Sequence, residues 1–325
     1  MSERPLIWLD VGVDEALRAA WPGLDEQVRL SSPLTRFEGR DDLHDASFIV
    51  ARGHSLGAAD FEQMPQLTGV TAWGVGFDHI DLAAATAHGI PVAYNPVFTT
   101  SVAEAALTLI LALAKRLPEL TAAAKAGAAD VARTAGVDRN TELAGKVLAV
   151  VGFGRIGRQL GRYASVLGME VLAIDPALDA SMLPAYARAV DLAEALPTAD
   201  VLVLAMPLTP ETRHIVGARE LSLMKPSAYL VNVGRGGLVD EAALLDALRA
   251  GRLGGAGLDV WEQEPPDPAD PLLALPNVVG TAHALARTHE SLARICAQTA
   301  ANAKAALAGL PMRDVLNPEV RKGTP

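Results

Sequence analysis

The sequence predicts an α/β protein with two doubly wound parallel-sheet domains. Short apolar segments rich in Val, Ile and Leu alternate with Ala- and Leu-rich segments of helical period along the chain. Continuous apolar segments of this kind are typical of strands buried on both faces of a parallel sheet. The alternation occurs in two consecutive sets, and the 325 residues match the length of about two domains.

The first set lies in the first third of the chain. Helices are expected at 14–21 and 81–89, between candidate strands at 5–10, 27–31, 46–52, 67–74 and 90–95. A long, mostly buried helix is expected at 101–117, with Ser101 as its N-cap and Glu104 at the capping-box position.

The second set follows a polar connecting segment at 124–146. Its candidate strands are 146–152, 170–175, 199–206, 228–234, 256–261 and 277–283. A long helix and a polar tail are expected after residue 286. Because each set can form a parallel sheet by itself, two domains are expected.

Composition and charge favour a globular, cytoplasmic protein and argue against a membrane-spanning or nucleic-acid-binding one. Half of the residues are hydrophobic and 20% are charged, as in ordinary globular proteins. The single cysteine, Cys296, and an N-terminus without an export signal favour a cytoplasmic protein. The apolar segment 102–115 is judged too short and too interrupted to span a bilayer. A net charge of −10 argues against a nucleic-acid partner.

A glycine-rich turn opens the second set. Gly152, Gly154 and Gly157 have the G-x-G-x-x-G spacing between an apolar strand and an amphipathic helix, which is the context of a dinucleotide-binding turn. Asp175 ends the next strand, where a carboxylate would accept hydrogen bonds from ribose hydroxyls and repel a 2′-phosphate. We therefore expect NAD as the cofactor. The alternative is a glycine-rich packing contact without a ligand.

Polar residues follow three later strands of the second set. Arg235 lies in a glycine-flanked turn, and glycines at this place are not expected for packing alone, so the guanidinium is a candidate carboxylate ligand. Asp259, Glu262 and Glu264 follow the next strand, and His283 follows the last. Because a histidine paired with a carboxylate is a common proton-transfer unit, these residues are candidates for catalysis.

Plainer interpretations remain open for the same residues. Arg235 could be a surface arginine beside a turn, and His283 could be a hydrogen-bonded structural histidine. His54 also follows a strand, and the pattern alone does not rank it below His283. No metal is expected, because the seven histidines include no H-E-x-x-H motif. Cys296 lies in a helical pattern and is expected to pack rather than react.

Six motifs in order resemble the D-isomer-specific 2-hydroxyacid dehydrogenases. They are GVGFDHIDLAAATAHGIPV, TTSVAEAALTLILALAKR, VVGFGRIG, PLTPETRHIVG, LVNVGRGGLVDEAAL and GAGLDVWEQEPP, and the resemblance is strongest over 74–288. It implies a Rossmann nucleotide domain at 99–284 inserted into a flavodoxin-like substrate domain made of 1–98 and 285–325. It also implies a homodimer.

The resemblance also implies roles for individual residues. Arg235 would bind the substrate carboxylate and carbonyl, while Glu264 would pair with His283, the proton donor to the keto oxygen. Backbone N–H groups of Val75 and Gly76 would hold the carboxylate. The positions implied to lie near the cofactor are Arg155, Ile156, Pro207, Thr212, Val233, Asp259 and Thr99, together with Arg235.

Departures from the family pattern bear on the substrate. Leu285 and Arg287 follow His283 where the family usually has small residues, and Phe98 replaces a small polar residue. Arg52 matches an arginine that some members use on a distal anion. Together with Arg287 it suggests a doubly charged substrate, such as a phosphorylated or sulfonated hydroxy acid.

Two other functions are consistent with the same motifs. One is an NAD(H)-sensing binding module similar to the C-terminal-binding corepressors, which retain the Arg, Glu and His set. The other is a formate or phosphite oxidiser, although that chemistry would predict glutamine rather than Glu264. An NAD(H)-dependent dehydrogenase of small D-2-hydroxy acids is the function that the resemblance favours.

Overall fold

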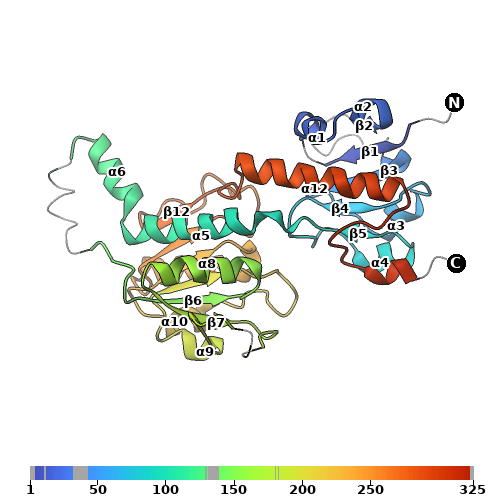
Figure 1. Ribbon diagram of the computed structural model, residues 1–325. Coiled ribbons are helices and arrows are strands. Elements are labelled where there is room, and N and C mark those ends of the chain that lie inside the picture. Colours follow the sequence, from blue (N-terminus) through green and yellow to red (C-terminus); the bar gives the residue numbers. More distant parts are fainter. Residues whose placement is uncertain are drawn as a thin grey trace. The chain divides into compact units, whose positions relative to one another are not determined.

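The chain forms two compact units, each with its own parallel sheet (Figure 1). Unit 1 consists of Met1–Phe98 and Arg287–Pro325, and unit 2 consists of Thr99–Ala286. The computed structural model describes residues 4–10, 12–31, 43–128, 130, 139–179, 181 and 183–322. The predicted class, two doubly wound α/β sheets, is confirmed.

The five strands of unit 1 have the order β2-β1-β3-β4-β5, which is the flavodoxin-like order. The strands are β1 (Leu6–Leu9), β2 (Arg29–Leu30), β3 (Ala46–Ala51), β4 (Val70–Ala72) and β5 (Val92–Ala93). The helices are α1 (Asp14–Ala20), α2 (Leu24–Gln27), α3 (Ala58–Glu62), α4 (Leu82–Ala87) and α12 (His289–Leu307). Short 3₁₀ turns occur at η1 (Leu43–Asp45), η2 (Pro96–Phe98) and η5 (Pro318–Lys322).

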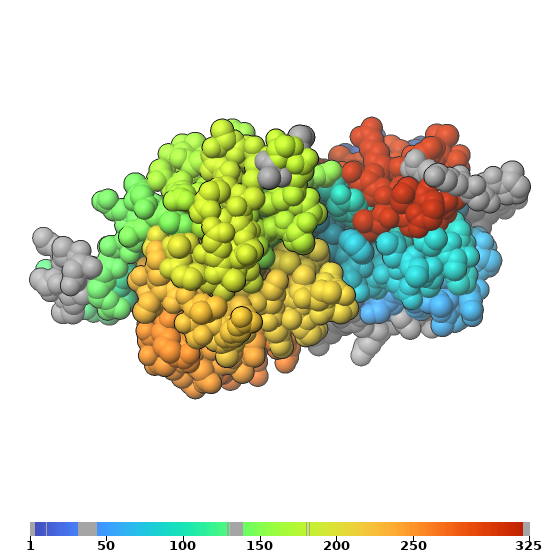
Figure 2. All heavy atoms as spheres, turned by 90° about the horizontal axis from the view of Figure 1, so that it is seen from below, coloured from blue at the N-terminus to red at the C-terminus, as the bar shows by residue number. Residues whose placement is uncertain are grey.

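The C-terminal segment completes unit 1. Ala300 and Ala303 of α12 are buried in one apolar cluster with residues of α1, β1 and β3. The buried Asn317 accepts a hydrogen bond from Val92 N–H at 2.8 Å and donates one to Ile90 O at 2.9 Å. Figure 2 shows this red segment against the cyan part of unit 1. The segment from α12 to Asn317 therefore packs with the strands of the N-terminal part of the chain in unit 1.

The seven strands of unit 2 have the order β12-β11-β10-β9-β6-β7-β8 and are all parallel. Counted within the unit, this is the 3-2-1-4-5-6 order of dinucleotide-binding sheets with one further strand. The strands are β6 (Val147–Val151), β7 (Glu170–Ile174), β8 (Ala187–Ala189), β9 (Val201–Leu204), β10 (Tyr229–Asn232), β11 (Gly255–Leu258) and β12 (Val278–Gly280).

Helices cover both faces of the sheet of unit 2 (Figure 1). One face is buried by α5 (Thr99–Ala114) and α8 (Arg155–Val166), the other by α9 (Leu192–Ala195), α10 (Ala218–Leu223) and α11 (Glu241–Arg249). Leu109 of α5 and Leu160 of α8 are buried with Val150 and Val203 of the sheet. The unit also contains α6 (Leu117–Lys125) and the 3₁₀ turn η4 (Gly236–Leu238).

The long helix predicted at 101–117 differs from the structure at both ends. Helix α5 begins at Thr99, directly after η2, so Ser101 is a buried residue within the helix and not its N-cap. The helix ends at Ala114 because Arg116 adopts a left-handed conformation with φ 49°, and α6 starts after it. The predicted helix therefore corresponds to α5, and α6 is a further helix that lies almost entirely beyond the predicted range.

The expectation that this segment is too short to span a bilayer is also wrong. Pro96–Ala114 is long and apolar enough by length and composition, and within the described residues it is the one helix that meets both criteria. Half of it is buried inside the protein. Its apolar residues Ala106, Leu109, Ile110 and Leu113 lie in the core of unit 2, which accounts for the composition.

Candidate active site

The glycine-rich turn after β6 has the shape that a dinucleotide requires. Gly152 has φ +90°, and a Cβ there would lie 2.7 Å from Ala205 O. A Cβ at Gly157 would lie 2.3 Å from Gly152 O, whereas a Cβ at Gly154 would meet nothing within 4 Å. Two glycines are therefore required by close packing, and the third leaves open space beside the first turn of α8. An anion is favoured there by the helix dipole and the free N–H groups.

Asp175 lies directly after β7, beside the same turn. Its Oδ2 accepts a hydrogen bond from Phe153 N–H at 3.0 Å, and its Oδ1 accepts one from Ala177 N–H at 2.9 Å. Each carboxylate oxygen can accept a further hydrogen bond, so the group is held in place and can still receive ribose hydroxyls. The turn and this carboxylate together fit a dinucleotide cofactor.

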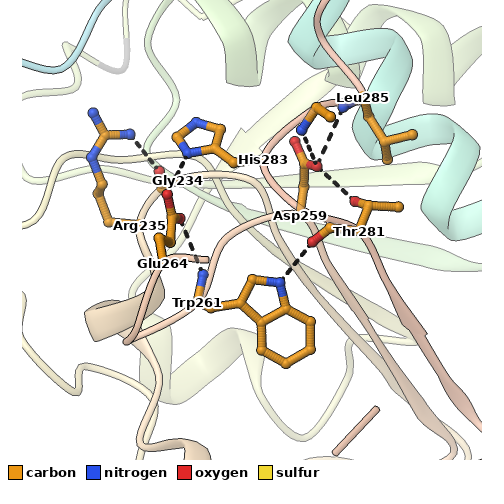
Figure 3. Close-up of polar contacts among 9 residues, drawn as sticks. Gly234, Arg235, Asp259, Trp261, Glu264, Thr281, His283 and Leu285 are labelled. Carbon is orange, nitrogen blue, oxygen red and sulfur yellow. Dashed lines mark hydrogen bonds and ion pairs between the residues drawn. The ribbon is translucent and has the colours of Figure 1, made fainter. Parts of the chain in front are cut away.

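Arg235 is held by the loop that follows β10. Asn232 Nδ2 donates to Arg235 O at 2.8 Å, and Asn232 Oδ1 accepts from Gly234 N–H at 3.1 Å. The Arg235 Nη1 donates to Gly234 O at 2.8 Å (Figure 3). The buried Asn232 side chain therefore holds the loop in place through these contacts.

The inference that packing does not require the glycines around Arg235 is wrong. A Cβ at Gly234 would lie 2.7 Å from Met206 O, and a Cβ at Gly236 would lie 1.8 Å from the carbonyl carbon of Trp261. Gly234 is needed because the loop after β10 lies against Met206 in the loop after β9, and Gly236 because it lies against Trp261 in the loop after β11. The latter contact brings the Arg235 loop next to the segment that ends at Glu264.

Replacement of Gly236 by Ala tests this contact. Because the added methyl group meets backbone atoms that cannot rotate away, the free energy of unfolding should fall by about 3 kcal/mol, the upper part of the range for overpacking. Urea denaturation measures the effect. Gly12→Ala is the matched control, since a Cβ there meets nothing within 4 Å. Equal stability of the two variants would contradict the contact.

Glu264 and His283 form a hydrogen-bonded pair between the ends of two strands. Glu264 Oε2 lies 2.9 Å from His283 Nδ1, and Glu264 Oε1 accepts from Trp261 N–H at 3.3 Å (Figure 3). His283 has φ 52°, and its N–H donates to Asp259 O at 2.7 Å. The pairing predicted from the family resemblance is therefore present in the geometry.

The surroundings of Glu264 favour its ionised form. Burial alone would raise the pKa of this carboxyl group, but the hydrogen bond and charge of His283, the Trp261 N–H and the charge of Arg235 together lower it. The carboxylate therefore accepts from Nδ1–H of His283, and Nε2 of the ring is left to exchange a proton. At pH values above the unfolded-state pKa of Glu264, the pair stabilises the folded state. This stabilisation is lost as the pH falls through the lowered pKa that Glu264 has in the folded state.

Asp259 anchors the loop that carries His283. The side chain is 4% exposed, and its Oδ1 accepts from Thr281 Oγ1 at 2.6 Å, Ala284 N–H at 3.0 Å and Leu285 N–H at 3.3 Å. Trp261 Nε1 donates to Thr281 O at 2.7 Å (Figure 3). The loops after β11 and β12 are thus joined at several points, and His283 lies at their junction.

Other predicted cofactor residues lie at the same edge of the sheet. Pro207 follows β9, and Thr212 Oγ1 donates to its carbonyl oxygen at 3.0 Å. Val233 follows β10, and its N–H donates to Leu204 O at 3.1 Å. Arg155 and Ile156 are the first residues of α8, and Thr99 is the first residue of α5. In an open α/β sheet, ligands bind at this carboxyl edge.

The remaining predicted residues belong to unit 1. Arg52 is exposed after β3, and Val75 and Gly76 follow β4. The N–H groups of Arg52, Gly53 and His54 all donate to Asp10 Oδ2, at 2.9, 2.7 and 2.7 Å. Arg287, at the start of the C-terminal part of the chain, is also in unit 1.

His54 and His283 differ in their surroundings. His54 is 9% exposed, and its ring packs edge-on against Trp8 with the centroids 5.5 Å apart. The side chain of His283 is 47% exposed and pairs with a carboxylate. His283 is therefore the better placed of the two to exchange protons with a bound molecule.

Two further observations concern metal binding and the reactivity of the cysteine thiol. Among the described residues, no group of three or more His, Cys, Asp and Glu side chains could hold a metal ion. Cys296 is buried in an apolar cluster with Val13 and Ile295, and burial raises the pKa of its thiol to about 11.

A second histidine–carboxylate pair lies near the first and could not be predicted from the sequence. His214 Nε2 lies 2.8 Å from Glu262 Oε1, next to the segment that carries Glu264. The sequence indicates Glu262 only as one of three acidic residues after β11. His214 lies in the PLTPETRHIVG motif. A histidine at this position gives no indication, in the sequence, of a partner 48 residues away.

Comparison with known proteins identifies the family. Residues 107–284 match the family model described as D-isomer specific 2-hydroxyacid dehydrogenase, NAD binding domain. The chain belongs to this family. Unit 2 is accordingly a domain that binds a nicotinamide cofactor, in agreement with the glycine-rich turn and Asp175.

Relatives from this family cover most of the chain. A D-3-phosphoglycerate dehydrogenase of Methanocaldococcus jannaschii is 39% identical over 90% of this chain and 55% of its own length. A glyoxylate/hydroxypyruvate reductase B of Serratia proteamaculans is 35% identical over 90% of both chains. The chain thus spans just over half of the first relative and nearly all of the second.

A solved 2-hydroxyacid dehydrogenase structure has the same fold. The D-lactate dehydrogenase of Aquifex aeolicus, crystallised with NAD and lactic acid, superposes with a TM-score of 0.82 and 30% identity. The match covers 94% of this chain and 96% of that one.

Proposed function

We propose that the protein is an NAD(H)-dependent dehydrogenase that interconverts small 2-keto acids and D-2-hydroxy acids. The observation that supports this most directly is the 2.9 Å contact between Glu264 and His283. This pair lies at the carboxyl edge of a dinucleotide-binding sheet, beside the loop that presents Arg235. An acid-oriented histidine and a guanidinium are the groups that reduction of a 2-keto acid needs.

The proposed mechanism assigns one task to each side chain. Arg235 binds the substrate carboxylate and polarises the carbonyl oxygen through its fixed donors. His283, oriented by Glu264 through Nδ1–H, gives a proton from Nε2 to the keto oxygen in reduction and removes it in oxidation. Glu264 stabilises the positively charged imidazole. The nicotinamide, when bound, supplies or accepts the hydride.

We propose that the cofactor is held by residues from five strand ends and two helix starts. The carboxylate of Asp175 receives the ribose hydroxyls, and the open space at Gly154 receives the pyrophosphate. The other residues proposed for this site are Gly152, Arg155, Ile156, Gly157, Pro207, Thr212, Val233, Asp259 and Thr99.

The preference for NAD over NADP should depend on Asp175. Asp175→Asn keeps the size and the acceptor for Phe153 N–H but removes the charge that repels a 2′-phosphate. Since a hydrogen bond to a charged group contributes about 1.5–3 kcal/mol, the ratio of kcat/KM for NADH to that for NADPH should fall about 10- to 100-fold. Steady-state rates with both cofactors measure this ratio. Asp191→Asn, at the N-cap of α9, is the matched control, and an unchanged ratio in Asp175→Asn would refute the assignment.

The substrate is proposed to be a small 2-keto acid, as the names of the relatives suggest. Backbone N–H groups of Val75 and Gly76 are proposed to contact its carboxylate. Arg52 and Arg287, two cations of unit 1, are proposed to favour substrates with a second negative charge. We further propose a cytoplasmic homodimer. The exposed apolar side chains Leu117 of α6 and Val166 of α8, which are 57% and 83% exposed, are consistent with self-association of unit 2.

A substrate panel tests the proposed function. NADH oxidation is followed with glyoxylate, pyruvate and hydroxypyruvate, and with a phosphorylated keto acid to test the second charge. Robust turnover supports a dehydrogenase. Tight NADH binding without turnover of any keto acid would instead favour an NAD(H)-sensing binding module. Faster turnover of the singly charged acids would refute the proposed role of Arg52 and Arg287.

A further inference from the structure

The pair formed by His214 and Glu262 lies beside the proposed catalytic pair but makes no contact that the mechanism above uses. His214 Nε2 and Glu262 Oε1 are 2.8 Å apart, and the two side chains are 40% and 37% exposed. A hydrogen-bonded side-chain pair as exposed as this contributes little to stability. Its significance therefore depends on what the two residues hold in place.

The backbone of His214 is attached to the loop that follows Arg235. His214 N–H donates to Gly237 O at 2.8 Å, and Val216 forms a parallel bridge with Val239. His214 itself has φ 50°, a left-handed conformation that few residues adopt. The segment 214–216 thus runs alongside 237–239, directly after the loop that carries Arg235.

Glu262 is the second residue of the segment Trp261–Glu264, and that segment is held on two sides. Glu262 N–H donates to Glu241 Oε1 at 2.8 Å, and Trp261 N–H donates to Glu264 Oε1 at 3.3 Å. On the other side, Trp261 Nε1 donates to Thr281 O at 2.7 Å. The contact with His214 ties the Glu262 side chain to the segment beside Arg235.

We propose that His214 is a positioning residue for the proposed reaction. His214 acts through Glu262. By holding the Glu262 side chain, it keeps the Glu264 carboxylate in contact with His283 and keeps the Arg235 loop beside this pair. The proposal rests on the proposed function. It explains why a pair of little value to stability joins the loops of two catalytic residues. A small displacement of an orienting carboxylate is costly, because proton transfer depends on its geometry.

The variant His214→Asn separates positioning from folding. Asn tolerates a positive φ but is too short to reach Glu262, so the backbone is kept and the contact is lost. We expect kcat to fall about tenfold with KM for NADH unchanged. Glu262→Gln, which keeps an acceptor oxygen, should retain more activity than Glu262→Ala. Arg188→Ala is the matched control, because it removes an exposed 2.8 Å ion pair with Glu194 elsewhere in unit 2.

A double variant with Glu264→Gln tests the route of the effect. If His214 acts through Glu264, the loss from His214→Asn should largely disappear in the Glu264→Gln background. An unchanged kcat in His214→Asn, or losses that multiply in the double variant, would overturn the proposal.

Amide hydrogen exchange gives a readout that does not require turnover. Protection of the segment 261–264 should decrease in His214→Asn and remain as in the wild type in Arg188→Ala. If the wild type fails to turn over any keto acid, the proposed function fails, and this exchange measurement still decides whether His214 holds the segment. Unchanged protection would then reject the positioning role.

Discussion

Replacement of His283 by Asn is expected to lower kcat for keto-acid reduction by about 10²–10⁴-fold, the usual contribution of a positioned general acid. Asn is chosen because it tolerates the positive φ of 52° at this position and leaves Glu264 without a proton-transfer partner. The dissociation constant for NADH should change little, because the cofactor is proposed to be held by other residues. Steady-state rates and NADH fluorescence titration measure the two quantities.

The control for this experiment is another exposed histidine. His289, the first residue of α12, has no assigned part in the reaction, and His289→Asn should keep wild-type kcat. A His283→Asn variant that retained more than about a tenth of wild-type kcat would be too active for the proposed acid. In that case the proton would have to come from another group or from water.

Replacement of Arg235 by Gln should lower kcat/KM for the keto acid by about 10²–10³-fold, the loss typical of removing a donor that stabilises developing negative charge. Gln is similar in length and neutral, so both the attraction for the carboxylate and the polarisation of the carbonyl are lost. Arg235→Lys should recover part of the binding but little of the rate, because an ammonium group lacks the planar pair of donors. Rates at several keto-acid concentrations separate kcat from KM.

Arg252→Gln is the matched control for the change at Arg235. Arg252 is exposed after α11 in the same unit and has no assigned contact with a ligand. Its replacement should leave kcat/KM unchanged. If Arg235→Gln behaved like this control, Arg235 would be a surface arginine, the alternative that the sequence left open.

Most strands of both sheets could be predicted, because each is an apolar run of the length that a buried strand requires. Strand β8 could not: its residues Ala187–Ala189 are polar or small, two of the three are exposed, and they lie at the sheet edge. The start of α5 was missed because the residues before it form a 3₁₀ turn that continues into the helix, whereas the capping pattern at Ser101 indicated a later start. Local sequence patterns do not reveal a short, exposed edge strand or a 3₁₀ turn that continues into a helix.

Candidate residues of the site were identified from their position after strands, but their contacts depend on loops that pack together. The glycines beside Arg235 illustrate this limit, since the contact between Gly236 and Trp261 joins two loops that no local pattern connects. The pair of His214 and Glu262 was missed for the same reason. The pairing of Glu264 with His283 was expected from the family motifs, whereas strand position alone left His54 as an equal candidate.

The most direct test of the proposed site is a crystal structure of the protein with NAD⁺ and oxamate, an unreactive analogue of a 2-keto acid. The oxamate carboxylate is expected to contact the Arg235 guanidinium. The oxamate carbonyl oxygen is expected within hydrogen-bond distance of His283 Nε2, with Glu264 bound to Nδ1 and the nicotinamide beside the analogue. Oxamate bound away from Arg235, or a His283 ring turned away from it, would contradict the dehydrogenase assignment.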